Sequence, residues 1–144
     1  MNHSTRVKVS FNIYGDQFPL DMVSLRMEMS PSYSYSKGEP VYSGSDELIR
    51  YREETVWSYS HEYQESLDVN EQLHEILYLT KGKEHVLHSI KKEYSLIFRI
   101  NIAIIIEEGI TPALYFHEPL IRYVHSIGAE IDVDLYANPY KDDE

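Results

Sequence analysis

Between residues 94 and 106, every second side chain is aromatic or aliphatic. A period of two is typical of a β-strand with one face in a hydrophobic core and the other face open. Ser95, Arg99 and Asn101 occupy positions between these side chains. The apolar set consists of Tyr94, Leu96, Phe98, Ile100, Ile102, Ile104 and Ile106. The segment predicts a long central strand, so the fold must be built around a sheet.

Other parts of the chain carry the same alternation over shorter lengths. Val7 to Ile13 and Ile131 to Leu135 each predict a strand with one buried and one open face. Residues 51–63 predict a further strand, in which the only tryptophan, Trp57, shares a face with its alternate neighbours. The pattern leaves open which face of that strand is buried. Residues 113–116, after a turn at 109–112, predict a short return strand.

Apolar residues at helical spacing, together with start and stop signals, predict the helices. Asp68 and Glu71 have the spacing of a capping box, in which each side chain accepts from a free amide at the helix start. Helices are expected over 20–27 after Pro19, from about Val69 to the break at Lys81-Gly82, over a turn or two around 86–90, and from Pro119 to Gly128.

This order of elements predicts an α+β protein with one domain over residues 1–144, a core over about 6–136 and a polar tail over 137–144. The sheet is expected to be mixed or antiparallel, with the helices packed on one face. The other face would then be open. It would display side chains of both charges, namely Lys8, Ser10, Asn12, Arg99, Asn101, Asp132 and Asp134.

Residues 30–47 interrupt the periodic segments. They are rich in serine, glycine, proline and tyrosine and show no alternation, which predicts a long loop. Tyr33, Tyr35 and Tyr42 lie in this segment among serines. Tyrosine with serine and glycine is typical of adaptable recognition surfaces, because the ring gives a large contact area at low rotamer cost. The alternative is that these rings pack the loop onto the sheet.

Composition narrows the classes of partner. Twenty-four acidic and thirteen basic residues give a formal net charge of −11, which disfavours nucleic acid and favours a basic protein partner. The longest apolar run is far shorter than a membrane-spanning helix, so no membrane association is expected. The absence of cysteine and of a signal-peptide pattern predicts a cytoplasmic protein.

The sequence lacks the motifs of known catalytic and cofactor chemistry. It has no nucleophile elbow, phosphate loop, dinucleotide-binding glycine triplet or His-Glu-x-x-His helix. His85 and His88 share a helical face but supply only two nitrogens, and one Glu-x-x-His unit at Glu71 to His74 is half of what a di-iron bundle needs. We therefore predict no catalytic residues, no metal ligands and no cofactor.

Four short motifs occur in a characteristic order along the chain. They are Gly15-Asp16-x-Phe18 after the first strand, Pro31-Ser followed by Lys37-Gly38-Glu39, Trp57-Ser58, and Ile127-Gly128-Ala129 before Ile131-Asp-Val-Asp134. In this respect the chain resembles a family of small stand-alone bacterial proteins classed as a domain of unknown function. Tyr33 or Tyr35 stands where the serine loop of that family often has tryptophan. The resemblance implies a fold and a bacterial origin, and it implies no activity or site residues.

Three functional hypotheses follow. The first is a non-catalytic binding domain, such as an immunity-type inhibitor that covers the active site of a basic toxin. The alternative is a small-molecule or metal-ion binding module or enzyme, with a pocket between residues 31–44 and the open sheet face, lined by Trp57. The third is a homodimer that buries the open face. The candidate binding residues are Tyr33, Tyr35, Lys37, Trp57, Arg99, Asp132 and Asp134.

Overall fold

The computed structural model describes residues 4–141, and its main element is a mixed six-stranded sheet. The sheet order is β2 (Tyr33–Tyr35), β5 (Thr55–Ser60), β1 (Arg6–Gly15), β7 (Ile97–Ile106) and β8 (Ala129–Ala137), and β6 (Gln64–Glu65) also pairs with β1. β1 is antiparallel to β5, β6 and β7, whereas β7 and β8 are parallel. The expected mixed sheet is therefore confirmed.

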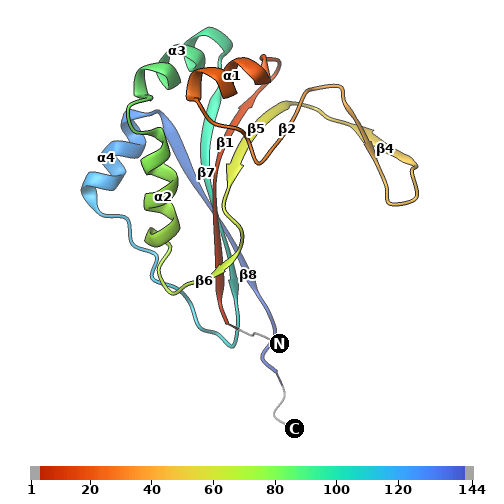
Figure 1. The fold of residues 1–144 in the computed structure, drawn as a ribbon. Coiled ribbons are helices and arrows are strands. Elements are labelled where there is room, and N and C mark those ends of the chain that lie inside the picture. The colour runs from red at the N-terminus through yellow and green to blue at the C-terminus, as the bar shows by residue number, and fades with distance from the viewer. Residues whose placement is uncertain (1–3, 142–144) are drawn as a thin grey trace.

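The helices are α1 (Leu20–Met27), α2 (Asn70–Thr80), α3 (Glu84–Tyr94) and α4 (Glu118–Ser126). They gather on one side of the sheet, as Figure 1 shows. The alternation in β1 and β7 turns their apolar side chains toward these helices, and the two strands meet Leu73, Leu87 and Ile90 in one hydrophobic core. Helix packing on a single face is thus confirmed, and the fold is α+β.

The long predicted strands and the first helix form where expected, while three boundaries differ. Tyr94 belongs to α3, because Ser95 adopts a left-handed conformation (φ 55°) that ends the helix before β7 begins. Helix α3 is a full 11 residues, longer than the expected turn or two. Of the predicted strand over 51–63, only Thr55–Ser60 forms β5.

The predicted return strand over 113–116 is wrong. Ala113 forms only an isolated parallel bridge to Asp68. Its N–H donates to the Leu67 carbonyl at 2.7 Å, and its own carbonyl accepts from the Val69 N–H at 3.3 Å. Proline at 112 has no N–H to extend this pairing. The segment therefore runs beside the residues that precede α2 on its way to α4.

The capping box before α2 forms only in part. The Asp68 carboxylate accepts from the Asn70 N–H at 3.0 Å, so Asp68 does satisfy a free amide at the helix start. The Asp68 N–H, however, donates to the Ser66 hydroxyl at 3.1 Å instead of to Glu71. Ser66 thus takes the place of Glu71, and its hydroxyl also donates to the Asp68 carbonyl at 2.8 Å.

The predicted loop over 30–47 is wrong in its secondary structure. It contains β2 and β3 (Pro40–Tyr42), and β3 pairs with β4 (Leu48–Tyr51) as a separate two-stranded hairpin. Strands of three or four residues are too short to show alternation. We call residues 40–51 the arm. Figure 1 shows it extending away from the sheet on the side opposite the helices.

The polar tail, which was predicted to begin at residue 137, begins at residue 138, because β8 ends at Ala137. Residues 138–141 follow without regular structure, and the Asn138 side chain donates to the Glu107 carboxylate at 2.6 Å. The last part of the tail, 142–144, lies outside the described residues.

Candidate functional site

Strand register decides which predicted site residues share the open face, meaning the sheet face away from the helices. Residues directly paired across neighbouring strands project to the same side. Five strands place one open-face row, which consists of Tyr33, Ser58, Asn12, Arg99 and Glu130. The next rows contain Ser60, Ser10, Asn101 and Asp132, followed by Lys8, Ala103 and Asp134. Tyr33, Arg99, Asp132 and Asp134 therefore lie on one surface although the sequence scatters them.

Tyr35 also lies on the open face, in a row with Val56 and Tyr14. The Arg52 guanidinium lies 3.9 Å from the centre of the Tyr35 ring, and Arg99 lies 5.2 Å from that of Tyr14. Burial raises the pKa of both Tyr14 and Tyr35 above the ordinary value of 10.0. Both hydroxyls are therefore neutral hydrogen-bonding groups at physiological pH.

The charges of the open face are unevenly matched. Arg99 donates to the Glu130 carboxylate through Nε at 3.3 Å and through a terminal nitrogen at 3.2 Å. Within residues 4–141, neither Asp132 nor Asp134 forms an ion pair. The two carboxylates project from alternate positions of β8 toward the same side. Lys8 lies in the same row as Asp134, but no ion pair within residues 4–141 neutralises either carboxylate.

Four buried polar atoms on the open side of the sheet have no hydrogen-bond partner within the described chain: Arg6 Nε, Asn12 Oδ1, Ser58 Oγ and Asn101 Oδ1. Asn12 does donate through Nδ2 to the Ser10 hydroxyl at 3.0 Å. Two of the four atoms are amide oxygens, which only accept hydrogen bonds, and Arg6 Nε only donates. The four atoms include both donors and acceptors, and all lie below the surface.

Trp57 does not line the open face, contrary to the expected pocket. It pairs with Ile13, so its indole points to the helix side, where it has 0% of its surface exposed. Its Nε1 donates to the Ser24 hydroxyl of α1 at 3.0 Å. The side chain is large enough to fill the core between β5 and α1, which is why the strand turns that face inward.

Lys37 also lies apart from the other candidates. Its ammonium pairs with Asp16 in the connection between β1 and α1, and its backbone N–H donates to the Thr55 hydroxyl at 3.0 Å. A cavity of about 340 Å³ adjoins it. The lining residues are Gln17, Phe18, Pro19, Ser36, Lys37 and Thr55. This cavity is therefore at the start of α1 rather than between the loop and the open face.

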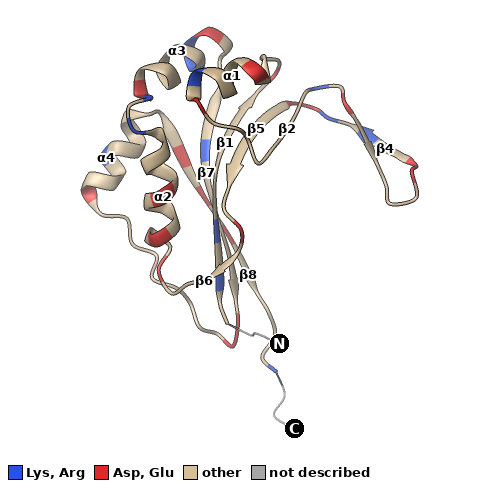
Figure 2. Ribbon diagram, viewed as in Figure 1, with Lys and Arg blue, Asp and Glu red and all other residues tan. Residues whose placement is uncertain are grey.

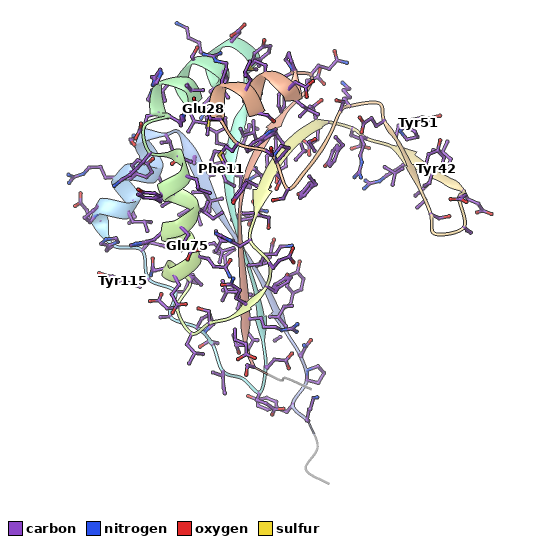
Figure 3. All side chains as sticks on the ribbon, viewed as in Figure 1. Phe11, Glu28, Tyr42, Tyr51, Glu75 and Tyr115 are labelled. Atoms are coloured by element: carbon purple, nitrogen blue, oxygen red, sulfur yellow. The ribbon has the colours of Figure 1, made fainter. Side chains whose placement is uncertain are left out.

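The arm supplies surface residues that sequence reasoning missed. Register places Pro40 opposite Tyr51 and Tyr42 opposite Leu48, with a β-bulge or irregularity between the two pairs. Exposed fractions are 58% for Tyr42, 49% for Leu48, 61% for Ile49 and 58% for Tyr51. Figure 3 shows Tyr42 and Tyr51 far from the helices and the core. Two short β-prone runs around Ser43-Gly44-Ser45-Asp46 were the available signal.

Histidines and carboxylates do not assemble into a metal centre within the described residues, where no group of three or more could hold an ion. The His74 and His117 rings stack with centroids 6.0 Å apart, beside a cavity of about 310 Å³ between α2 and α4. His61 pairs with Glu75 at 3.1 Å. No helix of the described chain is long and apolar enough to cross a membrane.

The fold and these surfaces define a small α+β domain with an exposed aromatic arm and an open sheet face that carries Asp132 and Asp134. The family described as "Domain of unknown function (DUF4279)" matches residues 5–138, and the chain belongs to this family. No curated protein and no solved structure matches the chain.

Three residues of the motifs that carried the family resemblance, Gly15, Trp57 and Gly128, serve the fold. A Cβ on Gly15 would lie 2.7 Å from a Leu96 methyl carbon and 2.8 Å from the Phe18 ring. Gly128 ends the α4 region with φ 72°, a conformation that glycine adopts without strain. Together with the buried Trp57, these residues fix how helices meet the sheet.

Proposed function

We propose that this chain is a non-catalytic binding domain for a basic protein, of the kind that would act as an immunity-type inhibitor by covering a toxin's active site. The observation that carries the proposal is the arm. Its apolar and aromatic side chains have no core of their own, and an isolated two-stranded hairpin is marginally stable in water. Contiguous exposed apolar surface of this sort is typical of protein–protein contacts.

The composition of the arm supports a binding role. Tyrosine and arginine are enriched among the residues that dominate binding free energy. The arm contains Tyr42, Arg50 and Tyr51, and Arg52 follows it directly. Tyr35 connects the arm to the open face, since Arg52 lies over its ring. A partner that binds the arm would therefore also contact the tyrosines and carboxylates of the open face.

The charge of the chain supports a basic partner. Acidic and basic residues both occur on the helices, the sheet and the arm, as Figure 2 shows, and the acidic excess of −11 over the whole chain creates a general attraction for positive surfaces. Asp132 and Asp134 add local carboxylates for lysine or arginine. The lack of cysteine fits a reducing compartment, and we place the encounter in the bacterial cytoplasm.

Affinity capture with matched variants tests the proposal. Tagged wild-type protein, a Tyr42→Ser/Tyr51→Ser arm variant, and a Leu25→Ser control on exposed α1 are incubated with lysate of the native host at low and moderate salt. We expect a stoichiometric basic protein with wild type and control, and at least about tenfold less with the arm variant, because losing one hot-spot residue costs about 2 kcal/mol or more. The purified partner should lose activity when the domain is added.

Two outcomes contradict the proposal. One is the recovery of no basic protein even at low salt. The other is a partner that the arm variant retains as well as wild type does. Circular dichroism of each variant excludes misfolding as the cause of lost capture.

A second candidate function is a small-molecule binding module, which the cavity between α2 and α4 favours. Its walls combine the stacked His74 and His117 with Tyr78 and Lys81, a mixture of aromatic surface and hydrogen-bonding groups. Resonances of the two imidazoles should then shift in NMR spectra when a panel of metabolites is titrated. Unchanged resonances across the panel would exclude this candidate.

A further inference from the structure

Strand β8 forms one border of the sheet. It has nine residues and pairs along its whole length with β7 on one side only. Among the described residues, no strand pairs with its other side. A strand at such a border presents a row of backbone N–H and C=O groups that a further strand can bind. At the opposite border the strand is β2, which has only three residues.

The side chains of β8 divide into two sets. Glu130, Asp132 and Asp134 point to the open face, and Ile131, Val133 and Leu135 point to the helix side. Leu135 has 60% of its surface exposed, so the helices do not cover this end of the strand. Glu130 is already engaged by Arg99, whereas the two aspartates are not ion-paired within residues 4–141.

A second copy of the chain is a poor occupant of this border. In an antiparallel pair centred on Asp132, that residue would face its own copy, and Glu130 would face Asp134. In a pair centred on Val133, Asp132 would face Asp134. Like charges directly opposite each other in a sheet are destabilising, and the net charge of −11 adds a general repulsion between copies.

We propose that β8 accepts an extended segment of a basic protein as an additional strand. The segment carries lysine or arginine at alternate positions, opposite Asp132 and Asp134, and apolar side chains between them, beside Val133 and Leu135. Backbone hydrogen bonds would supply affinity, and the alternating side chains would supply specificity. This inference rests on the proposed function for the basic character of the partner, but it uses the sheet border farthest from the arm.

Synthetic peptides test the proposal directly with the full chain. The probe is a short peptide in which lysine and valine alternate. One control has the same composition with all lysines in a block, and another replaces lysine by glutamate. We expect the alternating lysine peptide to bind at least about tenfold more tightly than either control and to shift the β8 amide resonances in NMR spectra.

Two further experiments separate strand addition from general charge attraction. Two peptides are made in which every second backbone nitrogen is N-methylated, one at the odd and one at the even positions. Only alternate N–H groups of an added strand point toward β8, so one peptide should lose binding and the other should keep it. An Asp132→Lys/Asp134→Lys variant should prefer the glutamate peptide. Both aspartates are at the surface, and circular dichroism checks that the variant folds.

Equal binding of the block peptide, or of both N-methylated forms, would overturn the proposal. So would an Asp132→Asn/Asp134→Asn variant that dimerises while the wild type binds no peptide, because the carboxylates would then serve to keep the border unpaired. If the peptides fail but the captured partner still depends on the arm, only this inference is wrong. If the peptides bind but no arm-dependent partner exists, the proposed role of the arm is wrong.

Discussion

At the scale of single residues, Gln72 shows how one buried polar side chain completes the sheet. Its Oε1 accepts from the Val9 N–H at 2.8 Å, and its Nε2 donates to the Val7 carbonyl at 2.7 Å. β5 pairs with β1 as far as Ser10, and β6 resumes the pairing at Val7. Gln72 from α2 therefore binds the β1 backbone in the gap between the two strands.

Replacing Gln72 by leucine should lower the free energy of unfolding by about 2–6 kcal/mol, because two buried backbone groups are each left without a partner at a cost of about 1–3 kcal/mol. Urea unfolding followed by Trp57 fluorescence measures the change. Gln17→Leu, at an exposed position, is the matched control and should stay within about 0.5 kcal/mol of wild type. A loss at Gln72 no larger than that of the control would show that water can replace the side chain.

At the scale of elements, the arm is attached to the sheet by a short base. The Gly38 N–H donates to the Arg52 carbonyl at 2.9 Å, and the Arg52 N–H donates to the Glu39 carbonyl at 2.8 Å. Beyond this base the hairpin pairs only with itself in the described sheets. The arm therefore contributes surface for a partner rather than packing for the core.

Replacing residues 40–51 by Asn-Gly should leave the domain folded, since Glu39 and Arg52 are already paired and Asn-Gly favours a two-residue hairpin turn. We expect the free energy of unfolding to change by less than about 1 kcal/mol, as for other exposed surface. Urea titration checks stability, and capture of the basic partner should be lost. A decrease well beyond that range would mean that the arm packs on the body in solution.

The contrast between elements also explains which ones the sequence revealed. β1 and β7 are 10 residues each, so alternation had room to appear. β2, β3 and β4 are three or four residues long, and their pairing is decided by partners elsewhere in the chain. The predicted loop over 30–47 and the predicted return strand over 113–116 failed for the same reason. In both places local pattern was weaker than long-range hydrogen bonding.

At the scale of the whole molecule, three tyrosines make the free energy of unfolding depend on pH in the alkaline range. Burial is the main cause that raises the pKa of Tyr14, Tyr35 and Tyr123 above the ordinary value of 10.0. The folded protein therefore holds these protons to higher pH than the unfolded chain does. As pH rises past this ordinary value, the unfolded chain ionises first and folding stability decreases.

The free energy of unfolding should be level in pH near neutrality with respect to these groups and should fall as pH rises above about 10. Tyr14→Phe should reduce the slope of that fall, because phenylalanine has no proton to lose. Urea unfolding at a series of alkaline pH values measures the slope, with Tyr115→Phe at an exposed ring as the matched substitution. An unchanged slope for Tyr14→Phe would contradict the linkage to that residue.

The sequence by itself determined the α+β class, the long strands, the first and last helices and the family. These follow from local periods and from turn residues such as Pro19, Pro119 and Gly128, whose effects need no distant partner. It also named Tyr33, Tyr35, Arg99, Asp132 and Asp134 as candidates, although they remain candidates.

Only the tertiary structure decided how those candidates are arranged. Strand register brings the five onto one face and turns Trp57 to the other, since a shift of one residue exchanges the two sides of a strand. Strand pairing likewise decides that β8 is the last strand of the sheet and that the arm forms a separate two-stranded sheet. Periods along a chain report that a strand has two faces, whereas only its neighbours decide what each face meets.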